Sequence, residues 1–123
     1  MPKGGTELFR ITMPWAPASW NVTRDRWKYC EIKDMWAVGV NAYAKKKLPE
    51  VRYDFPVRLI FEASWKDKRK HDVDNIFVKP IIDGLVRIGF FEGDDTKFIP
   101  EVVLRGKTGC KMDGLVIICE RYV

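Results

Sequence analysis

Apolar and polar residues alternate in several short segments of the chain, and a period of two is typical of β-strands. The alternation is clearest in residues 8–13 and 55–65. Residues 96–105 and 113–122 predict two final strands. The glycine-bounded segment 106–109 lies between these last two and is typical of a turn, so we expect them to form a hairpin.

Two longer segments repeat their apolar residues at helical spacing instead. Residues 31–48 predict a first helix, which the cations of residues 45–47 and then Pro49 would end. Residues 74–88 predict a second helix with one broad apolar face, and Gly89 is a suitable residue to end it.

The predicted order of elements is therefore β-α-β-α-β-β. This order is typical of a small α+β domain with its helices packed on a mixed sheet. A chain of 123 residues suits one such domain, so we treat residues 1–123 as a single unit. A domain of this size can fold on its apolar core without disulfides or a structural metal.

Charge adds a first indication of a partner. The chain has 22 Lys and Arg against 17 Asp and Glu, a formal net charge of +5. An excess of positive charge favours a polyanionic partner such as nucleic acid, although many basic proteins bind none.

The cysteines and apolar runs indicate the compartment. Cys30, Cys110 and Cys119 form no C-x-x-C pair, and we interpret them as buried thiols in a reducing cytoplasm. No apolar run approaches the length of a membrane span, and the N-terminus lacks the apolar core of a signal peptide. We expect a cytoplasmic protein without a membrane partner.

Candidate chemistry is concentrated before the second predicted helix. Asp72 and Asp74 are two residues apart, so in an extended segment both side chains lie on one side. Two such carboxylates suit Mg²⁺, which prefers hard oxygen ligands. Asp74 is also suitably placed as a helix N-cap, and a third acid could come from Asp94 or Asp95.

An Asp-x-Asp pair before a helix is commonly only a cap and a solvated acid. Here, however, a dense basic run precedes the pair, formed by Lys66, Lys68, Arg69, Lys70 and His71. Such a run beside two acids is expected where a polyanion and a divalent cation meet. We interpret His71 as a surface residue that contacts phosphate.

Two other features have alternative interpretations. Trp20 and Trp27 lie in a basic segment, where they could either stack on unpaired bases or pack against the protein. Gly106-Lys107-Thr108 imitates the end of a phosphate-binding loop, but Glu101 stands where that motif needs glycine. We therefore expect no nucleotide cofactor.

Taken in order, these motifs resemble the RusA-type Holliday junction resolvases of bacteria and their prophages. Residues 11–19 form a strand and Pro-rich segment followed by Asn21. The central string Asp72-Val73-Asp74-Asn75 leads into Lys79-Pro80 and Asp83-Gly84-Leu85, and Gly89-Phe90-Phe91 precedes Asp94-Asp95. The likeness extends over nearly the whole chain.

The resemblance implies a RusA-like fold and a homodimer that introduces paired symmetric nicks in four-way DNA junctions. It implies that Asp72, Asp74 and Asp95 hold Mg²⁺, with Mn²⁺ able to replace it, and that Lys79 assists catalysis. We expect the DNA contacts to come from the basic run and from polar residues on either side, namely Lys68, Arg69, Lys70, His71, Asn75, Asn21 and Arg24.

The chain departs from the family pattern at two intervals. Lys79 follows Asp74 by one residue more than expected, which would fit either a bulge in the helix or a later helix start. One extra residue before the second acidic pair leaves Asp94 and Asp95 as alternative third ligands. The alternative function is a non-catalytic DNA-binding protein of the same fold with a degenerate metal site.

Overall fold

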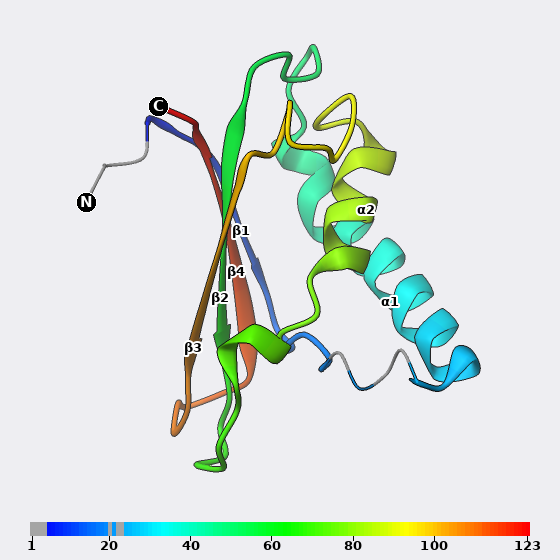
Figure 1. Cartoon of the computed structure of the whole chain (residues 1–123), viewed down its shortest axis with the longest axis vertical. Helices are drawn as coiled ribbons and strands as arrows, with labels where there is room; N and C mark the ends of the chain where they lie inside the picture. The colour runs from blue at the N-terminus through cyan, green and yellow to red at the C-terminus, as the bar shows by residue number, and fades with distance from the viewer. Residues whose placement is uncertain (1–4, 20, 22–23) are drawn as a thin grey trace.

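The protein is described by a computed structural model covering residues 5–19, 21 and 24–123. Its elements follow the expected order β-α-β-α-β-β, with two short 3-10 turns, η2 and η3, in addition (Figure 1). In chain order they are β1 (Glu7–Met13), α1 (Arg26–Ala44), η2 (Lys45–Lys47), β2 (Val57–Ser64), η3 (Val73–Asn75), α2 (Lys79–Ile88), β3 (Glu101–Lys107) and β4 (Gly114–Arg121).

The four strands form one mixed sheet in the order β1-β4-β2-β3. Strand β4 pairs antiparallel with both β1 and β2, whereas β2 and β3 run parallel. Both helices pack on the same face of this sheet (Figure 1). The prediction of an α+β fold with helices on a mixed sheet is confirmed.

The predicted hairpin between the last two strands is wrong. Strand β2 lies between β3 and β4, so these two strands do not pair. Instead of turning β4 back onto β3, the connecting segment is tied to the end of β2. The backbone N–H of Gly109 donates to Asp67 at 2.9 Å, and that of Cys110 donates to Trp65 at 2.9 Å. A glycine-bounded turn indicates a reversal of direction but does not select the strand that pairs next.

The core lies between the sheet and the helices. The alternating apolar residues of β2 supply its centre, and Leu59 and Phe61 are fully buried there. From α1, Trp36 and Val40 enter the same core. The helices approach closely, since a Cβ placed on Gly84 of α2 would lie 3.3 Å from Val40. This packing fixes the position of α2 relative to the sheet.

Helix α1 begins at Arg26, five residues before the predicted start. The side chain of Asp25 caps it by accepting hydrogen bonds from the backbone N–H groups of Trp27 at 3.0 Å and Lys28 at 3.1 Å. The first turn contains no buried residue, so it lacks the apolar periodicity from which a helix start could be predicted.

Helix α2 begins at Lys79, not at Asp74. Asp74 lies in the separate turn η3, so the expectation that it caps the helix is wrong; Val78 occupies that position without a side-chain cap. Of the two explanations for the extra residue before Lys79, the structure has the later helix start. Pro80 then falls in the first turn, where its missing N–H costs little. Gly89 ends the helix in a left-handed conformation, φ 111°, as predicted.

The cysteines differ from their interpretation as a buried set. Cys119 is buried in β4, where burial raises the pKa of its thiol. Cys110 is half-buried and Cys30 is exposed on α1, so the prediction is wrong for Cys30. Cys30 lies in the first turns of α1, whereas the buried residues of that helix begin at Trp36.

Within the described residues, neither helix combines the length and apolar character needed to cross a membrane.

Candidate metal and nucleic-acid site

The turn η3 presents the two predicted metal ligands, Asp72 and Asp74, to solvent. Backbone hydrogen bonds close the turn, with Asn75 N–H donating to Asp72 at 3.0 Å and Ile76 N–H donating to Val73 at 3.3 Å. Ile76 is almost fully buried directly after the turn. The turn is therefore anchored in the core while its carboxylates stay outside.

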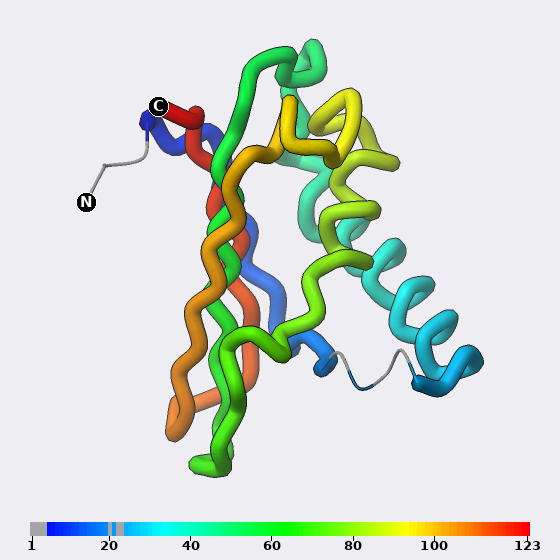
Figure 2. Tube along the Cα trace, viewed as in Figure 1, coloured from blue at the N-terminus to red at the C-terminus, as the bar shows by residue number. Residues whose placement is uncertain are grey.

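A second segment holds η3 from the other side. Residues 17–19 run beside residues 75–77, as the blue and green tubes show in Figure 2, and Ser19 pairs with Ile76 in an antiparallel bridge. The backbone N–H of Phe77 donates to Ala18 at 2.9 Å. The Ser19 hydroxyl accepts from the Asn75 side-chain amide at 3.3 Å. This contact joins the Pro-rich segment to the central motif.

Asp72 and Asp74 line one open depression together with Asn21 and Asn75. Among the described residues, neither carboxylate has a hydrogen-bond or ion-pair partner, so both can accept a ligand. Mg²⁺ in nucleic-acid enzymes is commonly held by one or two carboxylates and by substrate phosphates. Two carboxylates beside amide oxygens fit that requirement.

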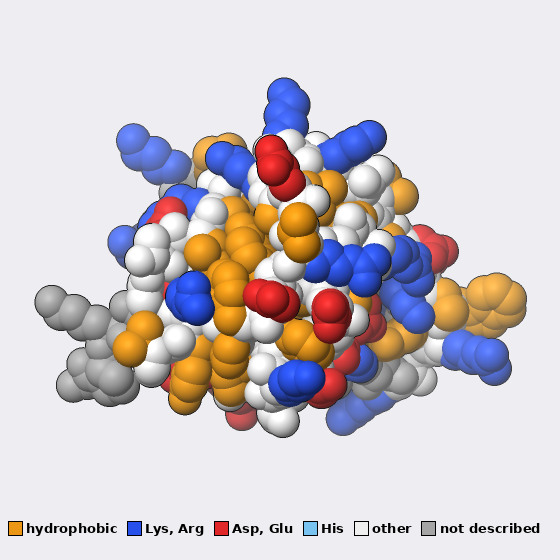
Figure 3. All heavy atoms as spheres, turned by 90° about the horizontal axis from the view of Figure 1, so that it is seen from above, with side chains coloured by type: hydrophobic (Ala, Val, Ile, Leu, Met, Phe, Trp, Pro, Cys, Tyr) orange, Lys and Arg blue, Asp and Glu red, His pale blue; other side chains and the backbone are white. Residues whose placement is uncertain are grey.

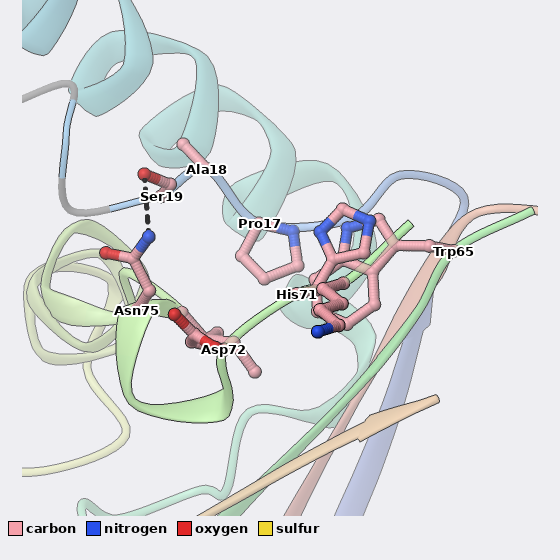
Figure 4. A pocket seen from close by; sticks show the side chains of 9 residues that line it. Pro17, Ala18, Ser19, Trp65, His71, Asp72 and Asn75 are labelled. Carbon is pink, nitrogen blue, oxygen red and sulfur yellow. Dashed lines mark hydrogen bonds between the residues drawn. The ribbon is translucent and has the colours of Figure 1, made fainter. Parts of the chain in front are cut away.

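A deeper pocket of about 250 Å³ adjoins this depression. Figure 4 shows its arrangement, with the stacked rings of Trp65 and His71 on one side, Asn75 and Asp72 on the other, and Pro17 close to the rings. Asp72 and Asn75 line both hollows and therefore form the wall that the two share. Sequence reasoning did not find this pocket, because its lining comes from two segments, residues 17–19 and 65–76, that lie about fifty residues apart.

His71 is held inside the fold more firmly than predicted. Its ring lies parallel to that of Trp65, with centroids 4.1 Å apart and 4° between the planes. Its Nε2 lies 2.8 Å from a carboxylate oxygen of Asp67, and this hydrogen bond lowers the pKa of Asp67. Only 24% of the His71 side chain is exposed. A phosphate contact by His71 stays a prediction.

The basic run forms an exposed turn at the lower end of the sheet in Figure 1. Asp67 shapes it by accepting from the backbone N–H of Arg69 at 3.0 Å. Lys68, Arg69 and Lys70 are all exposed, and 83% of the Arg69 side chain is accessible to solvent. Lys70 also lines the pocket, which brings this cation beside Asp72.

Lys79, the predicted catalytic cation, is paired with carboxylates along and beyond its helix. Its Nζ lies 3.3 Å from Asp83 and 3.6 Å from Asp94. The hydrogen bond to Asp83, with the charge of Asp94, raises the pKa of Lys79, so it stays protonated at neutral pH. Lys79 is not among the residues that line the depression.

The second acidic pair follows α2, whereas Asp72 and Asp74 precede it. Asp94 contacts Lys79, and Asp95 shapes the local turn by accepting from the backbone N–H of Lys97 at 2.9 Å. Within the described part of the chain, no three Asp, Glu, His or Cys side chains gather where they could hold a metal. The structure thus joins Asp72 to Asp74 but does not bring Asp95 to them.

The remaining predicted residues lie before α1. Asn21 lines the depression, and Arg24 is exposed next to the capping Asp25. Trp27 is 84% exposed, which leaves it available for stacking. Trp20 lies outside the described residues.

The upper end of the molecule has a different surface. Seen from above in Figure 3, basic and acidic side chains are mixed there, with apolar side chains between them. The exposed basic turn lies at the opposite end of the sheet.

No model of a known protein family matches this sequence, and no curated protein matches it. The resemblance to RusA-type resolvases therefore depends on the motif residues alone, and the activity it implies is a proposal.

Proposed function

We propose that this protein is a Mg²⁺-dependent endonuclease of the RusA type that resolves four-way DNA junctions in the cytoplasm of a bacterium or of a phage host. The observation that carries the proposal is the depression lined by Asp72 and Asp74 beside an exposed basic turn. Acids that bind a cation and cations that bind a polyanion then meet at one place.

The donor set supports Mg²⁺, or Mn²⁺ in its place. When bound, such an ion supplies a water made nucleophilic at neutral pH and absorbs charge on the departing oxygen. Asp72 and Asp74 would hold the ion. The side-chain oxygens of Asn21 and Asn75, which line the same depression, would bind it directly or through a water molecule. The missing third acid is consistent with a site that substrate phosphate completes, as is common for Mg²⁺.

The cations have separate roles in this proposal. Lys68, Arg69 and Lys70 would hold the DNA backbone at the basic turn, with Arg24 and His71 at the margins of the site. Lys79 would balance charge on the scissile phosphate after exchanging its ion pair with Asp94 for a phosphate oxygen. Half of its side chain is exposed, so such an exchange needs no unfolding.

A homodimer is part of the proposal. A chain of 14.4 kDa with one candidate metal site, at Asp72 and Asp74, supplies one cleavage site. A four-way junction has two strands to cut and two-fold symmetry, so a C₂ dimer would place one site on each. A monomer at working concentration, measured by light scattering, would count against paired cleavage.

One observation favours a second function, a DNA-binding protein of the same fold that does not cut. Asp95 is engaged in its own turn and Lys79 is paired with other carboxylates, so the site lacks two residues that the family uses. Such a protein would bind junctions through the basic turn whether or not Mg²⁺ is present.

A labelled synthetic four-way junction separates these functions. The protein is incubated with the junction and with a linear duplex of the same sequence, in Mg²⁺ and in chelator. We expect paired symmetric nicks in the junction with Mg²⁺ only. Junction binding without nicking in Mg²⁺ or Mn²⁺ would favour the non-catalytic function, and no salt-sensitive DNA binding would exclude both.

A further inference from the structure

The pocket beside the acidic depression is smaller and more enclosed than a backbone-binding groove. Its volume of about 250 Å³ is below the roughly 300–1,000 Å³ of pockets for drug-sized ligands. The space therefore suits one planar ring system better than a whole nucleotide. Pro17 and Ile76 are buried at its apolar side, next to the Trp65–His71 stack.

The polar side of the pocket carries both donors and acceptors. Lys70 supplies a cation, Asp72 a carboxylate, and Ser19 a hydroxyl that is already held by the Asn75 amide. A nucleobase offers matching groups, because it has donors and acceptors on its edge and an apolar face. An inorganic phosphate fits less well, since the Asp72 carboxylate would repel it.

The pocket and the depression share one wall. Asp72 and Asn75 face the proposed metal and phosphate site on one side and the pocket on the other (Figure 4). A nucleotide has the same arrangement, with a base joined through its sugar to a phosphate. The two neighbouring hollows can thus take the two parts of one nucleotide.

We propose that this pocket binds one unstacked nucleobase of the DNA strand, beside the phosphate to be cut. The inference rests on the proposal that branched DNA is the substrate. Bases at the crossing point of a junction lose a stacking neighbour more easily than bases in a duplex, so a pocket for a displaced base selects branched DNA.

The pocket is already built in the protein without DNA. The parallel stack of Trp65 and His71 is held by the hydrogen bond between the His71 ring and the Asp67 carboxylate, and Ser19 is fixed by its pairing with Ile76. A preformed pocket avoids the cost of ordering side chains when the base enters. Preference among the four bases would come from Lys70, Asp72 and Asn75.

The test places the fluorescent base 2-aminopurine either at the crossing point of a four-way junction or within one arm. Binding is measured in chelator, so that no strand is cut. We expect the wild-type protein to change the emission of the crossing-point probe and leave the arm probe unchanged. Ala18→Leu enlarges a side chain that lines the pocket, and Ala42→Leu makes the same change at an exposed position of α1.

Ala18→Leu should remove the emission change and weaken junction binding by about tenfold, the effect of losing one stacked base. Ala42→Leu should match the wild type. His71→Leu provides a second variant if Ala18→Leu unfolds, which circular dichroism would show; it should reduce the emission change by removing one ring of the stack. Unchanged emission and affinity in both folded pocket variants would overturn the inference.

The same samples with Mg²⁺ added separate the two proposals. Nicking by the wild type without any emission change at the crossing point would overturn the pocket and leave the nuclease. An emission change lost in Ala18→Leu, without nicking in Mg²⁺, would support the pocket and reject the nuclease. If neither signal is seen, both proposals are wrong.

Discussion

The two acidic pairs on either side of α2 have different surroundings. Asp72 and Asp74 lie in the turn before the helix, and no described residue pairs with their carboxylates. Asp94 and Asp95 lie after the helix, where Asp94 holds Lys79 and Asp95 accepts a hydrogen bond from its own turn. Both pairs are exposed, so burial does not distinguish them.

The difference lies in what already satisfies each carboxylate. A carboxylate that accepts hydrogen bonds within its turn stabilises that turn, and a metal ligand must exchange those contacts for the ion. Asp72 and Asp74 have no such contacts with the described residues to exchange. The first pair is therefore the stronger candidate for metal, and the second is better explained as part of the scaffold unless DNA or a partner subunit rearranges it.

The largest expected effect comes from Asp74→Asn. Loss of a direct metal ligand should lower nicking at least about 100-fold, because even indirect support of a metal site is worth 10- to 100-fold. Junction binding in chelator should be unchanged. The measurement is the initial nicking rate on a four-way junction at saturating Mg²⁺.

Asp95→Asn is the matched control in the other pair. Its nicking rate should stay within about tenfold of the wild type, because Asp95 chiefly supports its turn. An equal loss of nicking in Asp74→Asn and Asp95→Asn would contradict the assignment of metal binding to the first pair alone. It would mean that Asp72, Asp74 and Asp95 meet in the working complex.

The next effect concerns the basic turn. Replacing Lys68, Arg69 and Lys70 together with alanine should weaken junction binding, because up to three phosphate contacts are lost. The slope of log affinity against log salt should become smaller by about 2 to 3. Binding titrations at several salt concentrations measure this slope.

The control is the same triple replacement at Lys45, Lys46 and Lys47. This cluster is also exposed, but it follows the C-terminal end of α1, in η2, towards the upper end of the molecule in Figure 1. We expect the salt dependence to change little there. Equal slopes for the two triple variants would show that net charge, not the basic turn, drives binding.

Lys79→Ala should lower the stability of the fold only slightly. Its ion pairs are half-exposed, so the free energy of unfolding should fall by less than about 1 kcal/mol, measured by urea denaturation. A loss of about 1 kcal/mol corresponds to a change of about fivefold in an equilibrium constant or a rate. A larger fall in nicking would assign Lys79 to the cleavage site, whereas a fall of fivefold or less would assign it to the scaffold with Asp94.

The smallest expected effect is on the titration of Asp67. Because its pKa is lowered in the fold, Asp67 contributes stability above its ordinary value of 3.8, and this contribution is lost as the pH falls through the lowered pKa. In His71→Leu the pKa of Asp67 should rise toward the ordinary value. A side-chain NMR titration measures it, with Ala42→Leu as control; no rise would mean that His71 does not hold Asp67.

Much of the fold could be predicted because it depends on neighbours in the sequence. The alternation in residues 55–65 places Leu59 and Phe61 in the core, and it does so whatever the strand pairs with. Gly89 ends α2 because glycine readily adopts its positive φ. The basic run and the spacing of Asp72 and Asp74 could also be predicted, since both belong to one segment of fewer than ten residues, from Lys66 to Asp74.

Other features depend on contacts between distant segments. The Asp25 cap starts α1 through polar residues that show no periodicity, and the start of α2 at Lys79 follows from a separate turn at Asp74. The hairpin prediction failed because turn residues do not specify strand order. Insertion of β4 between β1 and β2 is decided by packing across the whole sheet.

The sequence alone therefore determined the order of the strands and helices along the chain, where α2 ends, and that two acids stand next to a dense basic run. Only the tertiary structure decided which acids share a surface. It also formed the pocket, because Pro17 and Ser19 meet Trp65, His71 and Asn75 only when residues 17–19 pair with Ile76. Residue spacing fixes the local backbone, whereas a site with two walls depends on how distant segments pack.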